Sequence, residues 1–231
     1  MCFSAEASFT AAAVLMPLGA AAMARAWRVD KSFVALCTLP LLFGLQQFAE
    51  GMVWVAGAAG DSAAVERYSL VYIFFSWIVW PIWVPVSVYF LEPASRRPLF
   101  LAFAIGGAML GGLQFVPYLT HEGWLTTTFL GRAIAYRDIN LLDVLISREG
   151  VYALYLTFII APLLVSTRRE AQIFGLLVLL AATITYFFFA FAYISAFCIG
   201  GAIMSLYLVL IIFRKGRRPP RDTAKSPLRV T

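Results

Sequence analysis

The feature that most constrains the fold of this chain is a series of apolar stretches, each about as long as a bilayer is thick. A helix needs roughly 20 mainly apolar residues to cross a membrane. Stretches that meet or approach this length span residues 8–24, 33–56, 68–91, 99–119, 151–166, 173–189 and 190–213. Only 13% of the residues are charged, against about 25% in ordinary soluble domains. The sequence therefore predicts an all-α polytopic membrane protein with seven transmembrane helices.

The last two stretches form one nearly continuous apolar run from residue 172 to residue 213. At 1.5 Å of rise per residue, this run is about twice as long as a single span requires. We therefore predict a helical hairpin with a turn near residues 191–195.

The distribution of Lys and Arg predicts the orientation of the bundle, because basic residues in short loops stay on the cytoplasmic side. With the N-terminus outside, the cytoplasmic loops and the C-terminal tail hold 14 of the 18 basic residues. Four basic and seven acidic residues then give the outer face a net charge of −3, while 14 basic and four acidic residues give the inner face +10. The predicted topology has the N-terminus outside and the C-terminus in the cytoplasm.

The chain divides into a predicted seven-helix bundle over residues 1–213 and a basic tail over residues 214–231. The tail is rich in Arg, Lys and Pro and has no apolar periodicity, so we expect it to be disordered. A basic run beside a membrane favours contact with anionic lipid headgroups. We therefore expect the lipid bilayer as a partner of the tail, and no nucleic acid.

One predicted outer loop, residues 120–150, is longer than connections in compact domains usually are. It carries His121, the only histidine of the chain, together with Tyr136. The loop could fold over the bundle as a lid, or its alternating residues 126–136 could form a small β-hairpin. Alternation over so few residues leaves both open.

Glu50 is a carboxylate inside an otherwise apolar stretch, where an ionisable residue is costly and usually functional. Spacings of three and four residues place Gln46, Gln47 and Glu50 on neighbouring parts of one helical face. Candidate partners from other spans are Ser76, Trp77, Ser87, Tyr186, Tyr193 and Ser195, and the loop that carries Tyr136 could cap the site. These residues predict an outward-facing polar site that binds a small molecule or an ion. The alternative is a structural hydrogen-bond network in which a protonated Glu50 only packs helices.

Two prolines in the third stretch, Pro81 and Pro85, each remove a backbone amide donor. We expect them to kink or break that helix near its inner half. A broken helix would line a cavity, whereas a kink would serve packing. In the fourth stretch, Gly107 and Gly111 have the small-xxx-small spacing that lets two helices approach closely.

The cysteines Cys2 and Cys198 are both expected near the outer side of the bundle. On an oxidising face they could form a disulfide, or they could remain as free thiols. They could also bind zinc or copper together with Glu50 or His121, because thiolate, carboxylate and imidazole groups suit these metals. A single histidine excludes the sites that need three histidine ligands.

Short motifs are spread over nearly the whole chain. They are the opening Met-Cys-Phe-Ser-Ala, Gln47-x-x-Glu50-Gly51, Trp80-Pro81-x-x-x-Pro85, Glu92-Pro93, Arg96-Arg97, Ile134-x-Tyr136 and Ser195-x-Phe197-Cys198. Together they resemble an uncharacterised bacterial family of seven-helix membrane proteins whose members begin Met-Cys-Phe-Ser-Ala.

The resemblance implies a multi-pass protein of the bacterial cytoplasmic (inner) membrane, and it implies no established activity. It also implies that Cys2, Gln47, Glu50, Tyr136 and Cys198 belong to one shared feature. That family often carries histidine where this chain has Gln46, which weakens the case for a histidine-bound metal at this position.

Three functions remain as hypotheses. The first is binding or transport of a small molecule or ion through a polar pocket around Glu50, as in a transporter or sensor. The second is an intramembrane metal- or thiol-dependent enzyme that uses Cys2, Cys198 and Glu50. The third is a structural or accessory membrane subunit whose polar residues pack helices.

Overall fold

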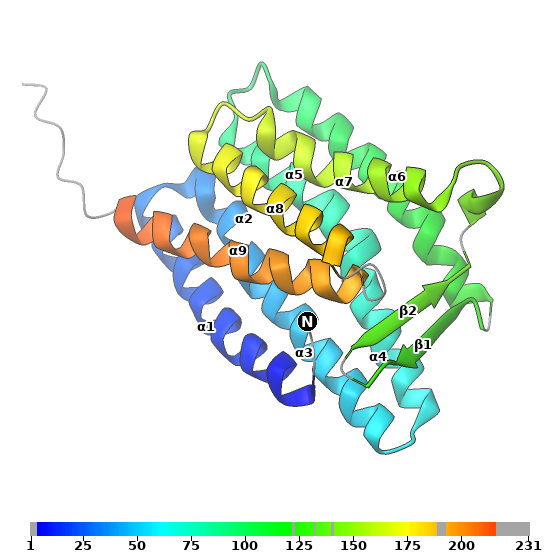
Figure 1. Cartoon of the computed structure of the whole chain (residues 1–231). Helices are drawn as coiled ribbons and strands as arrows, with labels where there is room; N and C mark the ends of the chain where they lie inside the picture. The colour runs from blue at the N-terminus through cyan, green and yellow to red at the C-terminus, as the bar shows by residue number, and fades with distance from the viewer. Residues whose placement is uncertain (1–3, 122, 132, 140, 189–192, 216–231) are drawn as a thin grey trace, which may run out of the picture.

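A computed structural model describes residues 4–121, 123–131, 133–139, 141–188 and 193–215. Within this part of the chain, seven helical segments form one bundle, and a small β-hairpin lies at one of its ends (Figure 1). Five of these segments are long and apolar enough to cross a membrane: Ala5–Val29, Lys31–Ala58, Ser62–Leu91, Arg97–Thr120 and Arg169–Phe188. The predicted helical membrane architecture is therefore confirmed at this level, whereas seven spans and their orientation stay predictions.

The first helix, α1 (Ala5–Val29), is capped by Ser4, whose side chain accepts a hydrogen bond from the Ala7 amide. It lies along α3 (Leu39–Ala58) with glycines at the points of contact. A Cβ atom at Gly19 would overlap the Leu41 backbone, and one at Gly44 would meet Met16. These glycines let the two helices approach closely.

The second helical segment begins with the short turns η1 (Lys31–Phe33) and α2 (Val34–Cys37) and continues as α3. Pro40 stands in the first turn of α3, where its missing N–H costs no hydrogen bond. The junction is also held from outside, because Trp83 Nε1 donates to Thr38 Oγ1 at 2.6 Å.

The third segment runs through α4 (Ser62–Phe74), a π-helical turn η2 (Phe75–Val79) and α5 (Trp80–Leu91). We expected the prolines to kink or break this helix. In the structure the helix is not broken: a π turn ends at Val79, just before Pro81, and the helix continues through Pro85. The predicted kink stays a prediction. The π turn takes up the extra residue and leaves backbone carbonyls free to accept other donors.

The fourth helix, α6 (Arg97–Thr120), packs against η2 and α5 through its glycines. A Cβ atom at Gly107 would overlap the Pro81 carbonyl oxygen, and one at Gly111 would overlap the Trp77 carbonyl oxygen. The close packing predicted for these two glycines is therefore present.

The long loop contains an antiparallel β-hairpin of β1 (Leu125–Phe129) and β2 (Ile134–Asp138), in which Thr127 pairs with Tyr136. This settles the question that alternation left open in favour of a hairpin, so the fold is not purely helical. A short turn, η3 (Leu141–Val144), leads on to α7 (Arg148–Leu164).

The chain ends in two helices that pack together, α8 (Arg169–Phe188) and α9 (Tyr193–Lys215). The predicted helical hairpin is therefore present. Of its predicted turn over residues 191–195, residues 191 and 192 fall outside the described residues, whereas residues 193–195 are not a turn but the start of α9.

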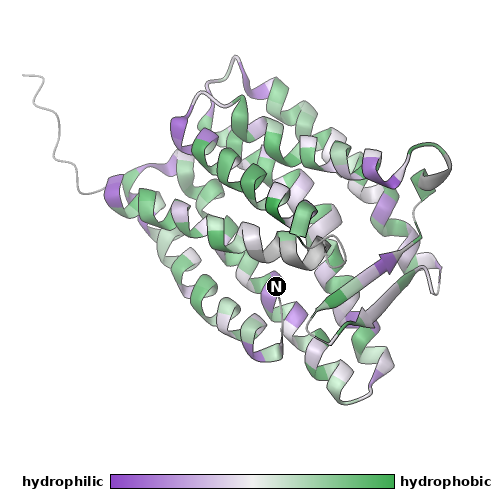
Figure 2. Ribbon diagram, in the orientation of Figure 1, coloured by the Kyte–Doolittle hydropathy of each residue, from purple (hydrophilic) through white to green (hydrophobic). Residues whose placement is uncertain are grey.

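The turns that carry most of the basic residues gather at the end of the bundle opposite the hairpin. Glu92, after α5, is buried and accepts hydrogen bonds from Ser166 Oγ at 2.6 Å and from the Thr167 amide at 2.7 Å. Lys215, at the end of α9, forms an ion pair with Asp30 at 2.8 Å. Figure 2 shows hydrophilic residues at these helix ends and on the hairpin, with mainly hydrophobic helices between them.

Candidate functional site

Gln46 is the centre of a buried hydrogen-bond network in the middle of the bundle. Its side chain is fully buried, and its amide Nε2 donates to Ser76 Oγ at 3.1 Å and to the Tyr72 carbonyl at 3.4 Å. Its Oε1 accepts a hydrogen bond from Trp80 Nε1 at 3.0 Å. One glutamine of α3 therefore binds three successive turns around the π turn of the third segment.

The π turn explains why these partners are available. In a regular α-helix each backbone carbonyl accepts a hydrogen bond from the N–H four residues later. A π turn shifts this pattern by one residue locally, so that some carbonyls lose their backbone partner. Next to it, the Tyr72 carbonyl accepts from Gln46, and the Ser76 carbonyl accepts from Tyr155 Oη at 2.7 Å. The irregular backbone is thus bonded by side chains of α3 and α7, as backbone buried in a membrane protein must be.

Gln47 and Glu50 continue the polar face of α3 toward the hairpin. Both are fully buried, and Gln47 Nε2 donates to Glu50 Oε2 at 3.4 Å. We call Gln46, Gln47 and Glu50 the α3 polar cluster. The predicted shared face is confirmed, and this face points into the bundle.

Tyr136 reaches the region of the cluster from the hairpin. Its ring stacks on that of Tyr72 at 4.8 Å between centroids, and the Tyr72 carbonyl is a partner of Gln46. The hairpin is fixed beside this contact by Thr127 Oγ1, which donates to Ser69 Oγ at 2.7 Å. Tyr136 was predicted as a site residue. In the structure it contacts Tyr72, which in turn contacts Gln46.

Trp77 lies on a different side of the third segment from the partners of Gln46. It is buried, but its ring packs against α7, at 5.2 Å from the Tyr155 ring, edge to face. Its link to the α3 polar cluster is indirect, through the Tyr155 hydroxyl on the neighbouring Ser76 carbonyl. Of the candidate partners on this segment, Ser76 bonds directly to Gln46, as does Trp80, which was not among the candidates.

The remaining predicted site residues are not described by the structure. Cys2 and the side chains of Ser195 and Cys198 lie outside the described residues. Among the residues that are described, no group of three or more His, Cys, Asp or Glu side chains is placed to hold a metal ion. His121 stacks on Trp124 at the end of α6, with 4.4 Å between ring centroids. The disulfide, the zinc or copper site and the thiol-dependent enzyme therefore stay predictions.

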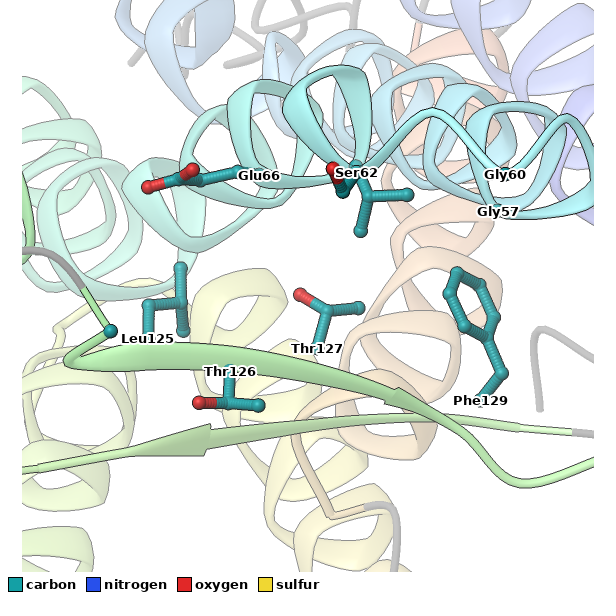
Figure 3. A pocket seen from close by; sticks show the side chains of 10 residues that line it. Gly57, Gly60, Ser62, Glu66, Leu125, Thr126, Thr127 and Phe129 are labelled. Atoms are coloured by element: carbon teal, nitrogen blue, oxygen red, sulfur yellow. The ribbon is translucent and has the colours of Figure 1, made fainter.

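A groove of about 460 Å³ lies between β1 and the corner that joins α3 to α4 (Figure 3). We call it the outer groove, and its lining residues are Gly57, Gly60, Ser62, Val65, Glu66, Gly123, Leu125, Thr126, Thr127 and Phe129. Sequence analysis did not identify this groove, because its two walls are about 60 residues apart in the chain. The predicted alternative of a hairpin over residues 126–136 included β1, which is one of the two walls.

Glu50 does not line the outer groove, but α3 connects the two. Phe129, at one end of the groove, lies 5.5 Å from the Trp54 ring. Trp54 stands four residues after Glu50, one helical turn further along α3. The Phe129–Trp54 pair therefore separates the groove from the α3 polar cluster.

Comparison with known proteins gives one match. Residues 1–226 match the model of a family described as "Family of unknown function (DUF6629)". No curated protein and no solved structure matches the chain.

Proposed function

The chain belongs to the DUF6629 family of unknown function, and from its buried polar residues we propose that it is a multi-pass membrane protein that binds a small molecule or an ion at the α3 polar cluster. The observation that carries this proposal is the full burial of Gln46, Gln47 and Glu50 on one helix that is apolar enough to span a membrane. A carboxylate at that depth is expensive, and such residues usually mark a substrate or ion path.

The cluster has the construction of a preorganised site. Gln46 is fixed by three hydrogen bonds to three successive turns of its neighbour, which leaves its position little freedom. Glu50 lies one turn closer to the hairpin and has Gln47 as a neutral donor. A neutral amide and a carboxylate side by side can bind a cation or a hydrogen-bond donor.

The hairpin is the proposed cover of the site. Tyr136 stacks on Tyr72, and Thr127 is bonded to Ser69, so the hairpin closes over the third segment next to Gln46. Access to the cluster would require the hairpin or its Phe129–Trp54 contact to move. Lids that close over a bound ligand commonly exclude water in this way.

The proposed setting is seven spans in the bacterial cytoplasmic membrane, with the hairpin outside and the C-terminus inside. In support, the described helices expose mainly apolar side chains, such as Ile105, Met109 and Val116 on α6. The basic turns also gather at the end of the bundle where the tail begins, next to Asp30 and Lys215. This end and the tail would contact anionic headgroups.

The test is ligand-dependent stabilisation of the purified protein in nanodiscs. Monovalent and divalent cations, amines, amino acids and small sugars are added singly, and the midpoint of thermal unfolding is followed for wild type, Glu50→Gln and Glu149→Gln. Glu149 is an exposed carboxylate in the first turn of α7, so its variant matches the charge change outside the cluster.

We expect at least one compound to raise the midpoint of wild type and Glu149→Gln but not that of Glu50→Gln. If every compound that stabilises the wild type stabilises Glu50→Gln equally, the α3 polar cluster is not a ligand site. The hydrogen-bond network would then serve helix packing alone.

A further inference from the structure

The outer groove has the size and the lining of a ligand site in its own right. Its volume of about 460 Å³ falls in the range of small-molecule sites, roughly 300–1,000 Å³. Three glycines, Gly57, Gly60 and Gly123, form part of the wall and keep the space open. A Cβ atom at Gly57 would already overlap the Phe129 ring.

The two ends of the groove differ in chemistry. Figure 3 shows the Glu66 carboxylate at one end and the Phe129 ring at the other, with the Thr127 and Ser62 side chains between them. The groove therefore offers a negative charge, hydroxyl groups and an aromatic ring in a row. Among the described residues that line the groove, Glu66 is the one that is ionisable.

Glu66 is exposed, and in the part of the chain that the structure describes it forms no ion pair. In the register of the hairpin, Arg137 of β2 stands directly opposite Thr126 of β1. Figure 3 shows the Thr126 side chain turned away from α4. Directly opposed residues of two paired strands lie on the same face of the hairpin. Arg137 is thus directed away from the groove.

From these features we infer that the outer groove binds a small organic ammonium ion. Its positive nitrogen would pair with the Glu66 carboxylate, since charge-assisted hydrogen bonds are the strong ones. Its carbon atoms would extend past Thr127 toward Phe129, whose ring face also favours a cation. An anionic ligand would be repelled by the Glu66 carboxylate, and a neutral ligand would gain nothing from its charge.

At its Phe129 end the groove meets Trp54 of α3, one helical turn from Glu50. Beneath Phe129, the indole N–H of Trp54 is buried and has no hydrogen-bond partner among the described residues. Glu50 lies one turn further along the same helix. A cation released from Glu66 would therefore meet an aromatic pair and then a second carboxylate. This inward route rests on the proposed function, whereas binding in the groove does not.

The experiment uses ethanolamine, which is a cation at pH 7, and ethylene glycol as its neutral analogue. Saturation-transfer difference NMR reports contact between the probe and full-length protein in nanodiscs of phosphatidylglycerol, which carry no ammonium headgroup. Wild type is compared with Glu66→Gln, with Ser62→Leu, which fills the groove without a change of charge, and with the exposed control Glu149→Gln. Each variant is first checked for wild-type thermal unfolding.

We expect ethanolamine to bind wild type and Glu149→Gln equally, and to bind Glu66→Gln about tenfold more weakly through the loss of one charge-assisted bond. Ser62→Leu should also weaken binding, because its larger side chain occupies part of the groove. If ethylene glycol gave a signal equal to that of ethanolamine, or if Glu66→Gln bound ethanolamine as well as the wild type does, the proposal that the ligand is an ammonium ion would be wrong. An undiminished signal from Ser62→Leu would overturn the location.

Two further arms separate related outcomes. Nanodiscs that contain phosphatidylethanolamine should reduce the ethanolamine signal if the natural ammonium is a lipid headgroup, and should leave it unchanged if the ligand is free in solution. Glu50→Gln should retain groove binding. If it does so while no compound depends on Glu50 for stabilisation, the proposed function fails and the groove site stands.

Discussion

Gln46 and Gln114 are two fully buried glutamines in opposite circumstances. Gln46 uses both ends of its amide, with three described partners. Gln114 on α6 has no hydrogen-bond partner for either amide atom among the described residues. A buried polar group without a partner costs about 1–3 kcal/mol. The same residue type therefore stabilises the bundle at one position and destabilises it at the other.

The contrast predicts opposite effects of the same substitution. Gln46→Leu should lower the free energy of unfolding by about 2 kcal/mol, because it also leaves the Trp80 N–H without its acceptor. Gln114→Leu should leave stability unchanged or raise it by about 1 kcal/mol. Unfolding by sodium dodecyl sulfate in mixed micelles measures both. A loss of stability in Gln114→Leu would mean that a bound water or ligand satisfies its amide.

Sequence reasoning identified Gln46 and Glu50 because a polar residue in an apolar span stands out by type alone. Ser76 and Trp77 were both candidate partners, because residue type alone could not tell which side of the third segment faces α3. A π turn contains one extra residue and changes the rotation of the helix by about 100°, so the facing side depends on a feature that sequence patterns do not show. In the structure Ser76 and Trp80 bond to Gln46, whereas the Trp77 ring packs against α7.

At the scale of elements, the prolines of one helix and the glycines of another form a matched contact. Pro81 has no N–H to offer the Trp77 carbonyl, and Pro85 has none for the Pro81 carbonyl. These are the two carbonyl oxygens that lie against Gly111 and Gly107 of α6. At such close approach, Cα–H groups are suitable weak partners for the freed oxygens.

Adjacent glycines of α6 supply a matched pair of variants. Gly111→Ala should lower the free energy of unfolding by about 1–3 kcal/mol, because its methyl group would overlap the Trp77 carbonyl, which is rigid backbone. Gly112→Ala has open space around its Cβ and should be neutral or stabilise by up to about 1 kcal/mol. Similar midpoints for the two variants in the same unfolding assay would show that α6 does not pack closely on η2.

How far elements could be predicted depended on their length. Long apolar helices were evident from composition, and the ends of the seven segments agree with the predicted stretches within a few residues. The hairpin over residues 125–138 was one of two alternatives, because ten strand residues carry little periodicity. The outer groove could not be predicted, since Glu66 and Thr127 become neighbours only through tertiary packing.

At the scale of the whole molecule, the first and last described helices are joined at the basic end. Burial raises the pKa of the Asp30 carboxyl, but hydrogen bonds from Lys215 and Ser32 and the charge of Lys215 outweigh this, so the pKa lies below its ordinary value. Lys215 also lies over the Phe33 ring, at 3.8 Å from the centroid, and 3.9 Å from Glu170. One lysine thus connects α1, η1, α8 and α9.

The direction of that pKa shift fixes how stability depends on pH. The pKa of Asp30 is lower in the folded protein than in the unfolded chain, where it is about 3.9. The contribution of Asp30 to the free energy of unfolding is therefore complete above the unfolded pKa and is lost as pH falls through the folded pKa. Asp30→Asn should lower the free energy of unfolding by up to about 1 kcal/mol at pH 7. Denaturation at pH 7 and near pH 3 measures the difference, which should shrink at the lower pH. A difference that is constant with pH would exclude the ion pair as its cause.

The join between Asp30 and Lys215 has a consequence for biosynthesis. A ribosome completes α1 and its following turn early, yet the partners of that turn, Glu170 and Lys215, emerge only with the last two helices. Until then α1 can pack on α3 but not on α9, and Asp30 lacks its Lys215 partner. The bundle therefore closes late, only after α9 has been synthesised, and a nascent chain that stops before α9 would present an unfinished surface to quality-control proteases.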